Sequence, residues 1–257
     1  MKAIVLAGGN IEQDSLLSGK IQAEKKSLAL IHGKPMVQWV VDALCDAKSV
    51  DQLLIMGLSE EDGISSSKPV IFMADSGSLI NNMRLGASEV ARISGQDEMI
   101  FVVSGDIPGL QGKMADWLAD QIEDDRYDIY YGTAPKHVIE KTFPGSNRSF
   151  INFKDVSICG GDINMFNTRL FQYESDLWEK LTNARKSPLK QAAMIGIFTM
   201  IMIAAKQLTL ESAAKRVCRK LKIRGKALVV PYAEMAMDVD KPHQFELMEK
   251  YLSERDA

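Results

Sequence analysis

The sequence has few cysteines and histidines. Its 257 residues include three of each, scattered along the chain and without a C-x-x-C pair. This usage is typical of reduced thiols in a cytosolic protein and argues against a disulfide framework or a histidine-based metal site. The chain opens on an apolar segment with a single lysine before it, which is not the pattern of a signal peptide. We therefore expect a cytoplasmic protein.

An excess of basic residues and a membrane-length apolar run are absent as well. The formal net charge is −3, whereas proteins dedicated to nucleic acids are usually basic, so we expect no nucleic-acid partner. An uncharged, mostly apolar run covers 14 residues, 192–205, and a transmembrane helix needs about 20. With 46% hydrophobic and 25% charged residues, the composition is that of a globular protein with a sizeable core.

Short apolar runs alternate with helical patterns in the first half of the chain. Runs of this kind predict buried strands of a parallel sheet, and they cover 3–6, 52–57, 69–74 and 99–103. Helical patterns begin near Pro35 and Ser78. The alternation predicts a doubly wound, mostly parallel sheet whose site lies at the carboxyl ends of the strands.

The second half is less regular. Further strands are expected at 127–134, once or twice within 149–167, and at 227–231. The final helix is expected at 240–252. Between them, the run 192–205 precedes seven lysines and arginines that fall between Lys215 and Lys226. Because the apolar residues of the run occupy every helix face, we expect it to pack within the domain or against a second subunit of a homodimer. The alternative is a peripheral membrane face.

The first apolar run stops at two adjacent glycines, Gly8 and Gly9. A turn without Cβ atoms after a buried strand lets backbone N–H groups face a ligand, and phosphate is the usual one. The same glycines are also compatible with a tight turn and nothing more. Both interpretations remain open from this dipeptide alone.

Four segments then occur in a defined order. They are LAGG after the first strand, Lys26 ahead of SLALIHGKPM, SGDIP after the fourth strand, and MDVDKP before the final helix. This set resembles the MobA-like nucleotidyltransferases, the molybdenum-cofactor guanylyltransferase type, and more broadly the sugar-phosphate and CMP-sugar nucleotidyltransferases. The resemblance extends from Lys2 to about Tyr251. It implies a Rossmann-like, three-layer α/β/α fold with a mostly parallel mixed sheet, of the nucleotide-diphospho-sugar transferase (GT-A-like) kind.

The activity that the resemblance implies is Mg²⁺-dependent. An NMP unit from an NTP would be joined to a phosphorylated or hydroxyl-bearing small-molecule acceptor, with release of pyrophosphate. We expect one domain over 1–257, with a nucleotide-binding half at 1–110 and an acceptor-binding half at 111–257. The second half would carry a helical insertion near 185–225, whose basic segment lines the acceptor side or stays solvated.

The resemblance also assigns residues to the nucleotide and the metal. The implied nucleotide-binding residues are Leu6, Ala7, Gly8, Gly9, Lys26, Ser78 and Asn82. Lys26 and Asp106 would be catalytic, with Lys26 neutralising the phosphates and the leaving pyrophosphate. The adjacent Lys25 is the alternative lysine. Mg²⁺, a hard cation that takes carboxylates and phosphates, would be held by Asp106 and Asp240, with Asp238 as the alternative second ligand.

The resemblance also suggests residues for the nucleobase and the acceptor. Ser78 and Asn82 would touch the nucleobase, although a plain helix surface explains them equally well. Asp162 and Asn164, beside the Gly-Gly-Asp turn, would face the acceptor. The chain departs from the family's common G-x-G-x-R-M loop because no arginine stands between Gly9 and Lys26, and Lys20 is a candidate replacement.

Three other function classes fit the sequence less well. A GT-A glycosyltransferase that uses a nucleotide sugar would carry a D-x-D pair after a mid-chain strand, where SGDIP has one aspartate. A non-catalytic nucleotide-binding protein would have little reason to keep Lys26, Asp106 and Asp240 together. A dinucleotide-dependent dehydrogenase is disfavoured because LAGGN does not form G-x-G-x-x-G.

Overall fold

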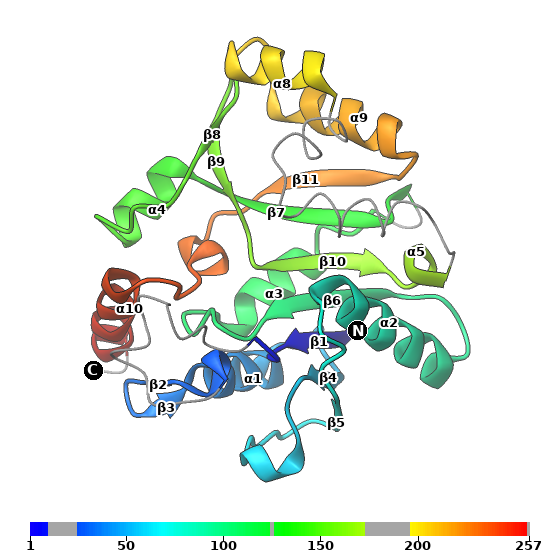
Figure 1. Cartoon of the computed structure of the whole chain (residues 1–257), viewed down its shortest axis with the longest axis vertical. Helices are drawn as coiled ribbons and strands as arrows, with labels where there is room; N and C mark the ends of the chain where they lie inside the picture. The colour runs from blue at the N-terminus through cyan, green and yellow to red at the C-terminus, as the bar shows by residue number, and fades with distance from the viewer. Residues whose placement is uncertain (10–24, 124–125, 173–195, 256–257) are drawn as a thin grey trace.

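A mixed sheet of nine strands runs through the computed structural model, which describes residues 1–9, 25–123, 126–172 and 196–255. The strand order is β5-β4-β1-β6-β10-β7-β9-β8, and β11 pairs with β7 (Figure 1). Four neighbouring strands of the first half are parallel. They are β1 (Lys2–Leu6), β4 (Gln52–Met56), β5 (Val70–Met73) and β6 (Met99–Ser104). These are the strands predicted from the apolar runs.

The central parallel strands are apolar throughout because both faces of the sheet are covered. In β1, Ala3 and Val5 belong to one core cluster and Ile4 to the other, the alternation expected of successive residues in a strand. The first cluster is covered by α1 (Met36–Asp46), α3 (Gly112–Ala119) and α10 (Pro242–Arg255). The second is covered by α2 (Leu79–Ser94) and α5 (Arg169–Gln172). This is the expected three-layer α/β/α arrangement.

The second half of the chain adds both parallel and antiparallel strands. β10 is antiparallel to β6 and β7, β9 is antiparallel to β7 and β8, and β11 is parallel to β7. The bounds are β7 (Ile129–Pro135), β8 (Ile151–Asn152), β9 (Ser157–Gly160), β10 (Ile163–Asn167) and β11 (Gly225–Val229). One or two strands were predicted within 149–167, whereas the structure has three, β8, β9 and β10, because turns interrupt the segment twice.

Smaller elements connect these layers. A two-stranded sheet pairs β2 (Leu30–Ile31) with β3 (Lys34–Pro35), and α4 (Lys136–Thr142) follows β7 directly. Short 3₁₀ turns lie at Lys26–Leu28, Glu60–Asp62 and Ala233–Ala236. The first and last of these turns flank the edge of the sheet at which the predicted site residues meet.

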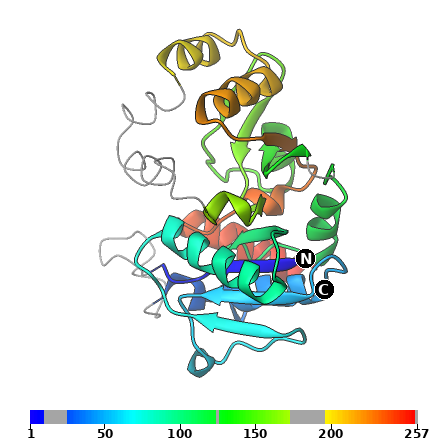
Figure 2. The same cartoon turned by 90° about the vertical axis from the view of Figure 1, so that its right-hand side faces the viewer.

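Two helices, α8 (Ile197–Ala204) and α9 (Leu210–Leu221), lie at one end of the molecule (Figures 1 and 2). They fall within the range 185–225 that was expected to be helical, of which 185–195 lies outside the described residues. The apolar run was expected to pack within the domain or against a second subunit, and the first of these is wrong for its described part. Ile197 and Phe198 are each 67% exposed, and Thr199 is the buried residue of α8.

The ends of β1 and β4 approach each other closely at Gly57. This glycine has φ +89°, and a Cβ there would lie 2.2 Å from the Cα of Gly8. Its N–H donates to the Met73 carbonyl at 2.7 Å, so the backbone has little freedom to move away. Gly57 thus fixes the spacing of the turns that follow the parallel strands.

Gly57→Ala should therefore destabilise the fold more than a glycine replacement at an open turn. We expect a loss of roughly 3 kcal/mol in the free energy of unfolding, from left-handed strain plus a backbone clash. The matched control is Gly63→Ala, whose φ is +71° with no atom within 4 Å of the new Cβ, and strain alone predicts a loss of roughly 1 kcal/mol. Urea unfolding measures both, and equal losses would contradict the proposed clash.

Candidate functional site

The carboxyl ends of the parallel strands bring the predicted motifs to one edge of the sheet. Leu6 pairs with Met56 and with Ser104, so the turns after β1, β4 and β6 start at the same level. The Gly8-Gly9 turn and Asp106 therefore share this edge. In open α/β sheets this is where ligands bind.

The two glycines of the first turn have different surroundings. A Cβ at Gly8 would lie 2.9 Å from Cγ of Asp75, whereas nothing lies within 4 Å of one at Gly9. The N–H of Ala7 donates to the Met56 carbonyl at 2.9 Å, while those of Gly8 and Gly9 have no acceptor among the described residues. Gly8 is thus required by the protein's own packing, and within the described residues neither glycine amide is taken up by another group.

Lys26 is tied to this turn across the intervening sequence. Its backbone N–H donates to the Gly9 carbonyl at 2.9 Å, and the Ser27 hydroxyl donates to the Ala7 carbonyl at 2.7 Å. The Lys26 ammonium then donates to Asp106 Oδ2 at 2.5 Å and to a carboxylate oxygen of Asp240. The structure therefore brings together the lysine and two aspartates that the sequence singled out.

The charge state of Lys26 follows from these contacts. Burial by itself lowers the pKa of the ammonium, but the charges and hydrogen bonds of Asp106 and Asp240 outweigh burial, so that the pKa is raised. Lys26 is protonated at neutral pH. The adjacent Lys25 points elsewhere and pairs with Asp62 at 3.2 Å. Lys20 lies outside the described residues.

Three carboxylates converge beside Lys26. Ligand atoms of Asp106, Asp238 and Asp240 lie within 4.8 Å of one another. The Val239 N–H donates to the Asp106 carbonyl at 3.1 Å, which joins the segment before α10 to the end of β6. Both Asp240 and its alternative, Asp238, are therefore within reach of a cation held by Asp106.

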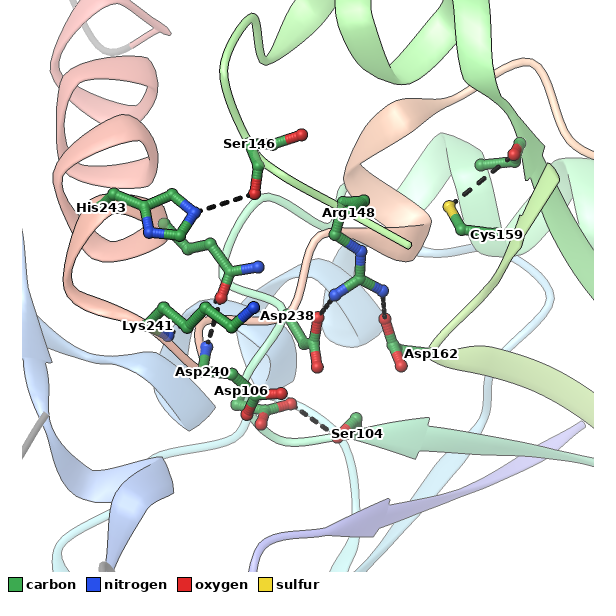
Figure 3. A network of polar contacts seen from close by, with 12 residues as sticks. Ser104, Asp106, Ser146, Arg148, Cys159, Asp162, Asp238, Asp240, Lys241 and His243 are labelled. Atoms are coloured by element: carbon green, nitrogen blue, oxygen red, sulfur yellow. Dashed lines mark hydrogen bonds and ion pairs between the residues drawn. The ribbon is translucent and has the colours of Figure 1, made fainter. Parts of the chain in front are cut away.

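Further hydrogen bonds fix the orientation of this cluster. The Ser104 hydroxyl donates to Asp106 Oδ1 at 2.6 Å (Figure 3). On the other side, Gln244 Oε1 accepts from the Asp240 and Lys241 N–H groups at 3.0 and 2.9 Å. The carboxylates are thus held by β6 from one side and by the first turn of α10 from the other.

Sequence reasoning missed Arg148. Its guanidinium forms an ion pair with Asp238 and another with Asp162 at 3.8 Å, and its side chain is 14% exposed (Figure 3). The loop that carries it is anchored to α10 by a hydrogen bond between His243 Nε2 and the Ser146 carbonyl, 2.9 Å long. An isolated arginine in a turn-rich stretch was the only local signal, because the contact depends on how this loop docks.

Asp162, one of the residues expected to face the acceptor, lies beside the guanidinium of Arg148. Its side chain is 24% exposed. Burial, joined by the charge of Asp106, raises the pKa of the Asp162 carboxyl from 3.8 to about 7, although Arg148 acts in the opposite direction. The carboxyl therefore changes charge near neutral pH.

The amides of Asn82 and Asn164 are occupied by the protein itself. Asn82 donates to Asp75 at 2.7 Å and accepts from the Ser76 N–H at 2.8 Å, which holds the turn that lies against Gly8. Asn164 accepts from the Gly132 N–H at 2.9 Å and donates to the Gly161 carbonyl at 3.0 Å.

Ser78 is the N-cap of α2 and accepts from the Asn81 N–H at 3.2 Å. Together with the bonds of the two asparagines, this contact shows how the turns around the site are held.

A three-layer α/β fold with lysine and aspartate side chains gathered at the carboxyl edge of its sheet is the architecture of an enzyme that handles anionic nucleotides. The comparison with protein families gives the same class. Residues 3–194 match the MobA-like NTP transferase domain, and the chain belongs to this family. It is a nucleotidyltransferase.

Solved structures share the fold over nearly the whole chain. A hypothetical transferase from Thermus thermophilus has a TM-score of 0.82 and 26% identity, with 95% of this chain and 98% of that chain covered. A CMP:2-keto-3-deoxy-manno-octonic acid synthetase complexed with CTP has a TM-score of 0.59 and 14% identity, with 99% and 100% covered. The 4-diphosphocytidyl-2C-methyl-D-erythritol synthase from Anaerococcus prevotii has a TM-score of 0.59 and 10% identity, with 98% and 95% covered.

The last two likenesses show the fold alone. A comparison with curated protein sequences finds no match.

The raised pKa of Asp162 predicts how the free energy of unfolding depends on pH. Between about pH 4 and pH 7 the folded state binds a proton at Asp162 that the unfolded state releases, so this carboxyl reduces stability as the pH rises. D162N removes the effect. Its free energy of unfolding relative to wild type should therefore rise from pH 4 to about pH 7 and then level off, as urea titrations at each pH would show.

The control for this measurement is D120N, which removes an exposed carboxylate at the end of α3. Its difference from wild type should change little over the same range. If the D162N difference were equally flat, Asp162 would titrate as an ordinary carboxyl and its raised pKa would be wrong.

Proposed function

We propose that this enzyme transfers an NMP unit from an NTP to a phosphorylated or hydroxyl-bearing small-molecule acceptor, with Mg²⁺ as cofactor and pyrophosphate as the second product. One observation carries the proposal. Lys26 bridges Asp106 and Asp240 directly beside the Gly8-Gly9 turn. Cationic, acidic and backbone-amide groups thus occur together, as in-line attack on an NTP phosphate requires.

The donor set suits a hard divalent cation. Mg²⁺ prefers carboxylate oxygens and keeps sites for phosphate and water, and ligand atoms of three carboxylates lie within 4.8 Å of one another. We assign Asp106 and Asp240 as the protein ligands. Asp238 is the weaker candidate because Arg148 neutralises it, whereas Lys26, the ion-pair partner of Asp240, would transfer part of its contact to the bound phosphates. When bound, the metal supplies positive charge that offsets the charge of the phosphates.

Lys26 and the glycine amides would bind the triphosphate. The N–H groups of Gly8 and Gly9 would hydrogen-bond phosphate oxygens, and the ammonium of Lys26 would pair with the phosphates in place of part of its contact with the carboxylates. Phosphoryl transfer of this kind needs positioning and charge neutralisation more than covalent help from the protein. These residues are held in place for that task by β1, β6 and the 3₁₀ turn at Lys26.

Arg148 and Asp162 would form the acceptor side. A guanidinium binds a phosphate or carboxylate through two parallel hydrogen bonds, so Arg148 could exchange its contact with Asp162 for an anionic group of the acceptor. Asp162, whose pKa is about 7, is suited to take the proton from an attacking hydroxyl at neutral pH.

A thermal-shift screen of the four common NTPs, with and without Mg²⁺, tests the nucleotide and metal assignments. A nucleotide that binds the folded state raises the melting temperature by mass action. We expect at least one NTP to stabilise wild type and D120N in the presence of Mg²⁺, and D106N to lose the Mg²⁺-dependent part of the shift. No shift with any NTP, or an undiminished shift in D106N, would contradict the proposal.

Transfer itself is tested with the NTP that the screen selects. Pyrophosphate release should begin when an ultrafiltrate of small metabolites is added, should require Mg²⁺, and should be lost in D106N but not in D120N. Release that is equally fast without the ultrafiltrate would indicate hydrolysis of the NTP and would count against transfer to an acceptor.

A further inference from the structure

The helix α8 has the reverse of the usual pattern of a surface helix. Ile197 and Phe198 are each 67% exposed and Ile201 is 58% exposed, while the one hydroxyl residue, Thr199, is 8% exposed. A surface helix of a globular protein normally places its apolar side chains toward the core. Contiguous exposed apolar side chains mark a surface that contacts something else.

The neighbouring helix α9 carries positive charge. Its apolar residues, including the buried Leu210 and Ala213, form the face that packs toward β11. The spacing of an α-helix places the basic residues on the other sides; they are Lys215, Arg216, Arg219 and Lys220. Lys220 reaches the beginning of α8, since its Nζ lies 3.4 Å from where a Cβ of Gly196 would be. The basic and apolar surfaces are therefore continuous.

These residues occupy the outermost part of the molecule. In two views at right angles, α8 lies at one end of the long axis, with α9 next to it (Figures 1 and 2). We call the exposed apolar residues of α8 and the four basic residues of α9 the tip surface. Because it projects at the end of the molecule, a broad flat partner can contact it without meeting the rest of the described structure.

We propose that the tip surface docks on an anionic lipid bilayer. Exposed isoleucine and phenylalanine side chains suit the boundary between headgroups and acyl chains, and lysines and arginines beside them suit lipid phosphates. The contact is peripheral: in the described part of the chain, no helix is long and apolar enough to cross a membrane. The proposal stands apart from the transfer reaction, whose residues it does not use.

A second copy of the chain fits the same surface less well. An isologous contact would place the basic residues of α9 near those of the other copy, where like charges repel. In addition, α8 is eight residues long, or about 12 Å, whereas a stable dimer buries about 800 Å² on each partner. Charge complementarity therefore favours lipid over self-association.

Co-sedimentation of the full chain with vesicles is the test. We expect binding to vesicles of about two parts phosphatidylcholine to one part phosphatidylglycerol, weakened by salt, and little binding to pure phosphatidylcholine. R216Q/R219Q should bind about 30-fold more weakly, since each basic residue strengthens binding about fivefold. F198S/I201S should bind more weakly by about tenfold or more, through the loss of inserted apolar area.

The matched control is L85S/R92Q on α2, which also removes one exposed apolar and one exposed basic side chain. It should bind as wild type does. Absence of wild-type binding to anionic vesicles, or binding that the tip-surface variants leave unchanged, overturns the proposal. So does a dimer in light scattering that F198S/I201S dissociates, because a second copy would then be the occupant.

Discussion

The ammonium group of Lys26 is the contact on which the arrangement of the site depends. Without it, Asp106 and Asp240 would hold two negative charges close together at the edge of a buried sheet, in addition to the nearby Asp238. Like charges at such distances repel strongly where solvent is partly excluded. The lysine offsets that repulsion. The same attraction to the two carboxylates raises the pKa of the Lys26 ammonium, although burial acts in the opposite direction. A divalent cation would perform the same electrostatic task.

The sheet determines where this contact forms. Lys26 is 80 positions from Asp106 and 214 positions from Asp240 in the sequence, so that only the fold can bring them together. Parallel strands β1 and β6 deliver the glycine turn and Asp106 to one edge, and the Val239–Asp106 backbone bond brings the segment before α10 to it. Arg148 then balances the remaining acidic side chains, which divides the site into a lysine side and an arginine side.

The elements that the sequence could predict are those whose burial produces a recognisable pattern in neighbouring residues. β1, β4 and β6 are buried on both faces, and this produces unbroken apolar runs that end where the chain turns. Asp106 stood out because it follows such a run with only Ser104 and Gly105 between them. The choice of Lys26, Asp106 and Asp240 as site residues came instead from the resemblance that the four ordered motifs carry, and their direct ion pairs were seen only in the structure.

The parts that were missed depend on packing between distant segments. Arg148 reaches the site through a loop that His243 holds, and nothing near Arg148 in the sequence specifies that contact. Gly8 was assigned to the nucleotide from the resemblance, whereas its packing against Asp75, a separate reason for a glycine there, could not be seen in the sequence. The apolar run at α8 was expected to pack within the domain or against a second subunit, because hydrophobicity predicts burial but does not identify the partner that provides it.

The most direct test of this account is the affinity of the protein for Mn²⁺, a paramagnetic substitute for Mg²⁺, measured without nucleotide in wild type, Lys26→Met and Lys25→Met. If Lys26 occupies the carboxylates that bind the metal, its removal should tighten Mn²⁺ binding by about tenfold, corresponding to about 1.4 kcal/mol of lost competition, while Lys25→Met should match wild type. Mn²⁺ affinity that falls or stays unchanged in Lys26→Met would contradict the shared site.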